Sequence, residues 1–145
     1  MTQEHYYDMT VRWDSDRKGT ASSRVLPTTI EVATPPEFPK GIEGIWSPEH
    51  FFVAAVNSCL MTTFLAIAEN SRLEFSGFSC QAVGKLEMVE GKYMISEITL
   101  QPTVTIPKAD DTERAERILH KAEAACLISN SIKSRIMFEP KIEVI

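Results

Sequence analysis

The chain has 145 residues, of which 43% are hydrophobic and 24% charged, and its formal net charge is −5. This size and composition favour one globular domain over residues 1–145 with a core of its own. An acidic chain without a basic cluster is not expected to bind nucleic acid.

The N-terminus carries no sign of export. Residues 1–5 lack the basic and apolar segments of a signal peptide, so we expect a cytoplasmic protein. Its three cysteines would then lie in a reducing compartment, where a paired thiol is more often redox-active than structural.

The first third of the chain is predicted to form a β-hairpin and a loop. Residues 6–13 alternate between apolar and polar side chains, which is typical of a half-buried strand. The polar segment 14–19 ends in glycine and predicts a turn, and a second strand is expected within 21–33. Residues 34–46 carry three prolines and two glycines, which predicts a loop.

A long helix is predicted over residues 47–71. Ser47 can cap its backbone N–H groups, Pro48 suits the first helical position, and Glu49 complements the helix dipole. Apolar residues surround the helix from 51 to 68, so we expect it to be buried on most sides. We do not expect a membrane span, because polar side chains interrupt the run: Asn57, Ser58, Thr62 and Thr63.

The remainder of the chain predicts a second hairpin, more helix and a last strand. Residues 78–106 alternate on either side of a turn at Glu90–Lys92. A one-sided apolar stripe predicts a second helix from about residue 110, and a short further helix follows near Ser129. The expected order is ββαββααβ, an α+β domain in which antiparallel sheets wrap a long central helix.

Cysteine is the residue type with the clearest capacity for chemistry. Cys59 lies in the middle of the long helix and Cys126 on the stripe of the second, although either cysteine alone is more often a small buried hydrophobe. Cys80 lies on the apolar face of a strand and is expected to be structural. No His–Cys spacing indicates a metal site, and we expect no cofactor. His50 lies about 13 Å of helical rise from Cys59, too far for the two to hydrogen-bond within one chain.

Two cysteine motifs carry a family resemblance. The segment Ser47-Pro-Glu-His-Phe-Phe, followed after six residues by Cys59, and the segment from Cys126 to Lys133 together resemble the OsmC/Ohr family over nearly the whole chain. The resemblance implies an intertwined homodimer with its active site at the subunit interface. It also implies a thiol peroxidase that reduces organic hydroperoxides and is recycled by a dithiol, either lipoyl-type or a small thiol.

The same resemblance assigns residues to roles. It implies that Cys59 reacts with the peroxide, that Cys126 resolves the product as a disulfide, and that Glu49 matches the family's Pro-Glu motif. Arg17 looks like the arginine that stabilises the thiolate, with Lys18 and Arg24 as alternatives. The sequence departs from many members in having Leu127, and not proline, directly after the second cysteine.

The chemistry sets its own requirements. A thiolate attacks peroxide, yet burial would raise the pKa of Cys59 and the helix terminus is too distant to lower it. We therefore expect a cation from elsewhere in the fold, with Arg17 first. Glu49 is expected to approach Cys59 of the other subunit in a two-fold dimer. The alternatives are a non-catalytic dimer of the same fold that binds a small apolar ligand, and a cysteine-nucleophile transferase or hydrolase using the partner chain's histidine.

Overall fold

The computed structural model describes residues 3–145 and divides by internal contacts into two compact units, one ending at Phe51 and the other starting at Phe52. Residues 1 and 2, part of the segment without signal-peptide features, lie outside the described residues.

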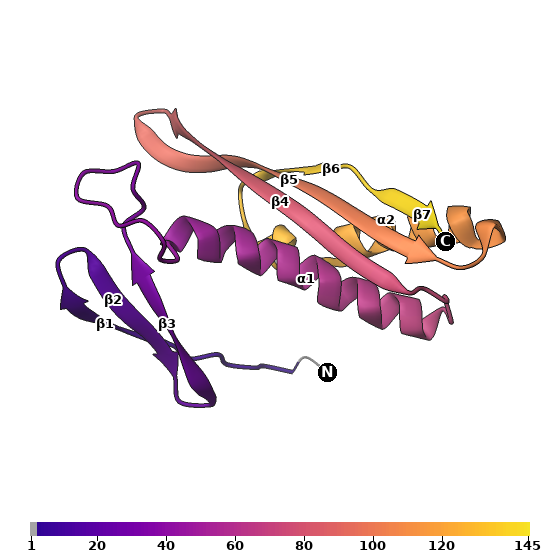
Figure 1. Cartoon of the computed structure of the whole chain (residues 1–145), viewed down its shortest axis with the longest axis horizontal. Helices are drawn as coiled ribbons and strands as arrows, with labels where there is room; N and C mark the ends of the chain where they lie inside the picture. Colours follow the sequence, from indigo (N-terminus) through magenta and orange to yellow (C-terminus); the bar gives the residue numbers. More distant parts are fainter. Residues whose placement is uncertain (1–2) are drawn as a thin grey trace. The chain divides into compact units, whose positions relative to one another are not determined.

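The first unit contains a three-stranded antiparallel sheet in the order β1-β2-β3 (Figure 1). Its strands are β1 (Thr10–Ser15), β2 (Lys18–Ser23) and β3 (Leu26–Ala33). The prediction of a single strand within 21–33 was wrong, because the chain reverses between Ser23 and Leu26. The Asp8 carboxylate stabilises this reversal by accepting hydrogen bonds from the backbone N–H and the side chain of Arg24, both at 3.3 Å.

The predicted start of the long helix is confirmed. Helix α1 (Pro48–Asn70) begins at the expected proline, and the Ser47 hydroxyl accepts a hydrogen bond from the backbone N–H of His50 at 3.2 Å. Trp46, the last residue of the preceding loop, stacks on Phe51 with 5.7 Å between ring centroids. The chain therefore enters α1 through a capped and packed turn.

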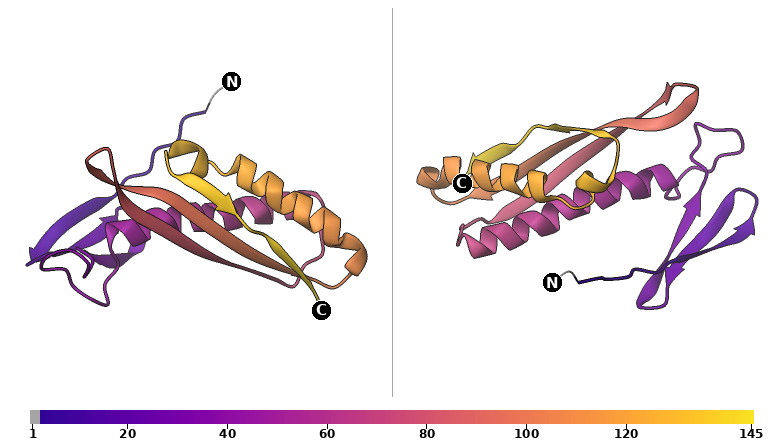
Figure 2. Two further views of the ribbon diagram at one scale, coloured as in Figure 1. Left: turned by 90° about the horizontal axis from the view of Figure 1, so that it is seen from above. Right: turned by 180° about the vertical axis from the view of Figure 1, so that it is seen from behind.

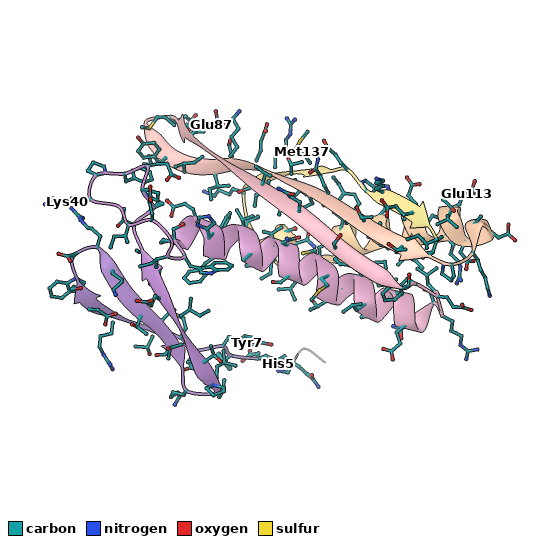
Figure 3. All side chains as sticks on the ribbon, viewed as in Figure 1. His5, Tyr7, Lys40, Glu87, Glu113 and Met137 are labelled. Carbon is teal, nitrogen blue, oxygen red and sulfur yellow. The ribbon has the colours of Figure 1, made fainter. Side chains whose placement is uncertain are left out.

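The second unit pairs two helices with a mixed sheet. The strands are β4 (Gly77–Val89), β5 (Lys92–Ile106), β6 (Arg135–Phe138) and β7 (Lys141–Val144). β5 pairs antiparallel with β4 and parallel with both β6 and β7. Helices α1 and α2 (Thr112–Ala125) lie along the same face of this sheet (Figure 2). Glu87 and Met137 point away from the helices on the other face (Figure 3).

The α+β class is confirmed, but the element order differs from the prediction. Three strands precede α1, and two strands follow α2. The short helix expected near Ser129 is a three-residue 3-10 turn, Ser129–Ser131. The second sheet is also mixed and not purely antiparallel, because β6 and β7 join β5 in parallel after the α2 crossover.

Within one chain, α1 is buried along one side only. Its buried residues recur every four positions: Val56, Leu60, Phe64 and Ala68. Met61 and Leu65 remain 39% and 40% exposed, so the expectation of burial on most sides is wrong for the single chain. By length and hydropathy α1 could also cross a membrane, a test that core helices of soluble proteins pass as well. The buried stripe is that of a helix packed on a protein core.

Strand β4 lies close to α1 one to two turns before Cys59. A side chain at Gly84 would meet Val53 Cγ2 at 2.6 Å, so the glycine permits this approach. The amide of Asn57 donates a hydrogen bond to the Cys80 carbonyl at 3.0 Å. These contacts fix the middle of α1 on the sheet.

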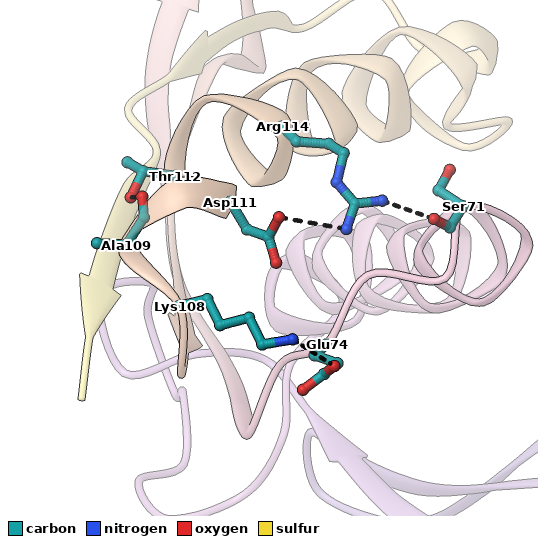
Figure 4. Close-up of polar contacts among 7 residues, drawn as sticks. All are labelled: Ser71, Glu74, Lys108, Ala109, Asp111, Thr112 and Arg114. Carbon is teal, nitrogen blue, oxygen red and sulfur yellow. Dashed lines mark hydrogen bonds and ion pairs between the residues drawn. The ribbon is translucent and has the colours of Figure 1, made fainter.

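Polar contacts tie the end of α1 to the start of α2 (Figure 4). Arg114 donates to the Ser71 carbonyl at 2.7 Å and pairs with Asp111 at 3.4 Å. Lys108 pairs with Glu74 at 3.1 Å. The two helices are thereby held in one register, which determines where the cysteine following α2 meets α1.

Candidate functional site

The structure brings the thiols of Cys59 and Cys126 together. Cys59 is half-buried in the middle of α1, and Cys126 is the buried residue directly after α2. The Cys126 thiol donates a hydrogen bond to the Cys59 sulfur and lies 4.0 Å from the carbonyl oxygen of Val56, one turn earlier on α1. The pair is reduced and in contact, the arrangement that formation of a disulfide requires.

The pKa of Cys59 is lowered although the thiol is partly buried. Burial is the largest single influence and raises this pKa, but four hydrogen bonds together outweigh it. The donors, in decreasing effect, are the Ile128 backbone N–H, the Cys126 thiol, the Thr63 hydroxyl at 3.8 Å and the Leu127 backbone N–H. Cys59 therefore ionises more readily than an ordinary thiol.

These donors correct the expectation that only a cation could lower this pKa. The backbone N–H groups come from the segment that follows Cys126, where the chain leaves α2 in an extended conformation with φ −65° and ψ 110°. In the sequence, Leu127 was notable only because many members of the family have proline at this position. Because proline has no N–H, the presence of leucine here also indicates that the backbone of residue 127 can donate a hydrogen bond, and this signal was missed.

Cys126 differs from Cys59 in the direction of its shift. Burial raises the pKa of Cys126, and the neighbouring Cys59 raises it further. The side chain and backbone N–H of Ser129 partly offset the effect of burial on this pKa. Of the two thiols, Cys59 loses its proton first and Cys126 keeps its proton to donate.

Cys80 has no comparable partner. Burial raises its pKa to about 11, and a single backbone hydrogen bond from Gln101 opposes this. Such a thiol is protonated throughout the neutral range. This environment agrees with the structural role expected for it.

Arg17 and Glu49 line one cavity in the first unit. The cavity has a volume of about 580 Å³, and its apolar walls include Val11, Trp13 and Phe38. The Oε1 atom of Glu49 is buried and has no hydrogen-bond partner among residues 3–145. A buried carboxylate oxygen without a partner is costly, so this group is prepared to accept a hydrogen bond.

The two alternative cations are each paired with a carboxylate. Lys18 also lines the cavity but pairs with Glu31 at 2.9 Å, and Arg24 pairs with Asp8 at 3.3 Å. Within the described part of the chain, Arg17 forms no ion pair. Of the three candidates, Arg17 is therefore the one whose charge is not already neutralised.

His50 has a local structural role. Its Nδ1 lies 2.7 Å from the Ser47 hydroxyl at the start of α1, and its ring meets Trp46 edge to face. Among residues 3–145, no cluster of three or more His, Cys, Asp or Glu side chains is placed to hold a metal ion. Among the described residues, the best candidates for chemistry are thus the thiol pair and the cavity lined by Arg17 and Glu49.

Comparison with known proteins places these features in a family. A family model described as OsmC-like protein matches residues 41–141, which include both cysteines of the pair and Glu49. The chain is 26% identical over 146 residues to YmaD, an uncharacterised protein of Bacillus subtilis, covering 97% of this chain and 95% of that protein.

Solved structures show the same fold. An OsmC-like protein of unknown function from Vibrio cholerae has a TM-score of 0.85 and 25% identity, covering 94% of this chain and 99% of that one. An organic hydroperoxide resistance protein from Elizabethkingia anophelis has a TM-score of 0.78 and 19% identity, and both chains are covered completely. At the latter identity the likeness is one of fold.

Proposed function

Because the chain belongs to the OsmC-like protein family, we propose that it is a thiol-dependent peroxidase that reduces organic hydroperoxides in the cytoplasm. The observation that carries this proposal is the hydrogen-bonded thiol pair, in which the pKa of Cys59 is lowered and Cys126 lies in contact. A structural cysteine needs neither a lowered pKa nor a second thiol beside it. One protein with the same fold is an organic hydroperoxide resistance protein, which supports the choice of substrate class.

The first step consumes the peroxide. The Cys59 thiolate attacks one oxygen of the O–O bond, so that a sulfur–oxygen bond forms and the O–O bond breaks. The alkoxide leaves and takes a proton to become the alcohol. Cys59 is oxidised to a sulfenic acid as the peroxide is reduced.

The second step forms the disulfide. The sulfur of Cys126 attacks the sulfenic sulfur of Cys59, the S–S bond forms, and the S–O bond breaks. The oxygen leaves as water with the proton that Cys126 gives up. A dithiol reductant, lipoyl-type or a small thiol, then returns both cysteines to the thiol form by thiol–disulfide exchange.

The proposal includes a homodimer with a shared site. Glu49 and Cys59 are ten residues apart on α1, a rise of about 15 Å, so one chain's glutamate does not serve its own thiol. We assign Arg17 and Glu49 to the Cys59 of the partner subunit, where the arginine stabilises the thiolate. The exposed apolar residues Met61 and Leu65 on α1 support burial of this helix face against a second copy.

Apolar surroundings support an organic substrate over hydrogen peroxide. The cavity that contains Arg17 and Glu49 is walled by Val11, Trp13 and Phe38. Apolar walls favour an alkyl or aryl group by the hydrophobic effect and give no such gain to hydrogen peroxide.

The test is peroxide consumption by purified protein. Wild type with cumene hydroperoxide and dihydrolipoamide is expected to turn over, Cys59→Ser to lose at least about a thousandfold in rate, and Cys80→Ser to retain wild-type activity. If wild type does not consume peroxide and its Cys59 resists alkylation at neutral pH, the peroxidase proposal fails. The non-catalytic reading would then be favoured, in which a dimer of this fold binds a small apolar ligand.

A further inference from the structure

The turn between β1 and β2 places Arg17 at the cavity of the first unit. Both residues at the centre of this turn, Asp16 and Arg17, line the cavity. Asp16 has a left-handed backbone conformation with φ 48°, so the chain reverses tightly at this point. The contacts that hold the turn therefore also determine where the arginine side chain begins.

Two hydrogen bonds hold the successive carbonyl groups of this turn. The indole N–H of Trp13 donates from Nε1 to the Asp16 carbonyl at 3.0 Å, and the Thr34 backbone N–H donates to the Arg17 carbonyl at 3.2 Å. The Thr34 bond uses main-chain atoms, and any residue except proline could make it. The bond to Asp16 comes from a side chain and depends on the indole ring of residue 13.

Packing within one chain does not account for Trp13. The residue is 73% exposed, so its ring is not part of the core of the first unit. It lines the same cavity as Arg17 and Glu49. One side chain thus supplies an apolar wall of the cavity and, through its ring nitrogen, an anchor for the turn that carries the cation.

We propose that Trp13 is a positioning residue for Arg17: its indole N–H holds the Asp16 carbonyl and thereby keeps the guanidinium at the cavity. This inference rests on the proposed function, in which Arg17 stabilises the Cys59 thiolate of the partner subunit. A charged group stabilises a developing charge most effectively when it is already in place, because no reorganisation is then required. A fixed backbone also reduces the entropy that a long arginine side chain loses when it is ordered. Loss of the indole N–H should therefore weaken the effect of Arg17 without removing its charge.

The experiment measures the pKa of Cys59 in the reduced, full-length protein from the pH dependence of its alkylation, followed by peptide mass spectrometry. Arg17→Ala is expected to raise this pKa by about one unit. Trp13→Phe keeps an aromatic wall and removes the N–H, and it should raise the pKa by about 0.5 units. The double variant should match Arg17→Ala alone, because an anchor has no effect once the cation is gone.

Peroxide kinetics separate the anchor from the wall. Trp13→Phe should slow the oxidation of Cys59 by cumene hydroperoxide about threefold at pH 7, and the loss should disappear above the pKa of the thiol. Trp13→Ala removes the wall as well, so the ratio of its rates with cumene hydroperoxide and hydrogen peroxide should fall about tenfold. Trp13→Phe should leave that ratio within about twofold of wild type.

Thr20→Val is the matched control for general loosening of the hairpin. The Thr20 hydroxyl donates to the Asp14 carboxylate at 2.6 Å, a contact of the same hairpin that does not involve either carbonyl of the turn. This variant should keep the wild-type pKa of Cys59. An unchanged pKa in Trp13→Phe, an equal rise in Thr20→Val, or additive rises in the double variant of Trp13 and Arg17 would overturn the inference.

Failure of the proposed function gives a different result. If wild type consumes no peroxide but Arg17→Ala and Trp13→Phe both raise the pKa of Cys59, the peroxidase proposal fails and the positioning role stands. If peroxide is consumed and only Arg17→Ala raises the pKa, the positioning role alone fails. If Arg17→Ala leaves the pKa unchanged, the positioning role fails together with the assignment of Arg17, whereas peroxide consumption by wild type still decides the function.

Discussion

Cys59 on α1 and Cys80 on β4 are both partly buried thiols of the second unit, yet their pKa values move in opposite directions. Burial raises both, and it is the largest influence on each. Cys59 receives four hydrogen bonds that reverse the effect, whereas Cys80 receives one that does not. Cys80 is also the more deeply buried of the two, so both the donors that face the sulfur and the depth of burial separate the acidity of Cys59 from that of Cys80.

The largest expected difference between the two thiols is in the rate at which each is alkylated at pH 7. A thiol with a pKa of about 11 is ionised in roughly one molecule in ten thousand, whereas one below the ordinary 9.0 exceeds roughly one in a hundred. Lower nucleophilicity of the more acidic thiolate returns about a factor of ten. We therefore expect iodoacetamide to label Cys59 at least about ten times faster than Cys80, measured by peptide mass spectrometry.

The pH dependence gives this test its sign. The thiolate is the reactive form, so each labelling rate rises with pH and levels off above the pKa of that thiol. The Cys59 rate should level off below pH 9.0, and the Cys80 rate should still be rising near pH 11. Similar rates and similar profiles would contradict the contrast, and Cys59→Ser checks that the fast-labelling site is correctly assigned.

Removing one backbone donor from Cys59 should reduce the difference in pKa between Cys59 and Cys80. Leu127→Pro deletes the N–H at this position, and the ψ of 110° at Cys126 is compatible with a following proline. Leu127 has the smallest effect of the four donors to Cys59, so we expect the pKa of Cys59 to rise by about 0.3 units. The midpoint of Cys59 alkylation against pH measures it.

Leu127→Ala is the matched control for the proline variant. It removes the same side chain, which is 65% exposed, and keeps the N–H. The alanine variant should titrate like wild type. If both variants shift equally, the backbone donor at 127 does not determine the acidity of Cys59.

Local sequence signals predicted the elements that local chemistry defines. The long hairpin of β4 and β5 was confirmed because its strands alternate and Glu90–Gly91 supplies residues at positive φ, 49° and 80°, for the turn. The start of α1 was confirmed because Ser47 and Pro48 carry capping chemistry in their side chains. The α+β class followed from these elements.

Features set by distant contacts were not predictable in this way. The reversal at Arg24 has no glycine, proline or asparagine in its two turn residues, and it depends on Asp8, sixteen residues earlier. Strands β6 and β7 pair only with β5 in the described sheet, across a helix. The apolar residues around α1 indicate which side chains can be buried, but they do not indicate which side of the helix is covered within one chain.

In the candidate site, too, residue types could be predicted from the sequence, whereas contacts that depend on the fold could not. The sequence singled out Cys59, Cys126, Arg17 and Glu49 by residue type and by family resemblance, and their roles stay predictions. It could not reveal that Leu127 and Ile128 donate to Cys59, because a backbone N–H is common to every residue except proline. Ser129 was seen only as a possible helix cap, since its effect on the pKa of Cys126 depends on how the turn folds.

A similarly small effect is expected from the one side-chain hydroxyl that faces Cys59. Thr63→Val removes that hydroxyl, which lies 3.8 Å from the sulfur, and preserves the shape of the side chain. Because the contact is long, we expect the pKa of Cys59 to rise by only about 0.3 units, which roughly halves its alkylation rate below the pKa. Thr62→Val is the control, since the Thr62 hydroxyl donates to the Cys59 carbonyl at 3.2 Å and not to the sulfur. A clear loss for Thr63→Val with none for Leu127→Pro would mean that this side chain, and not the Leu127 N–H, helps to distinguish Cys59 from Cys80.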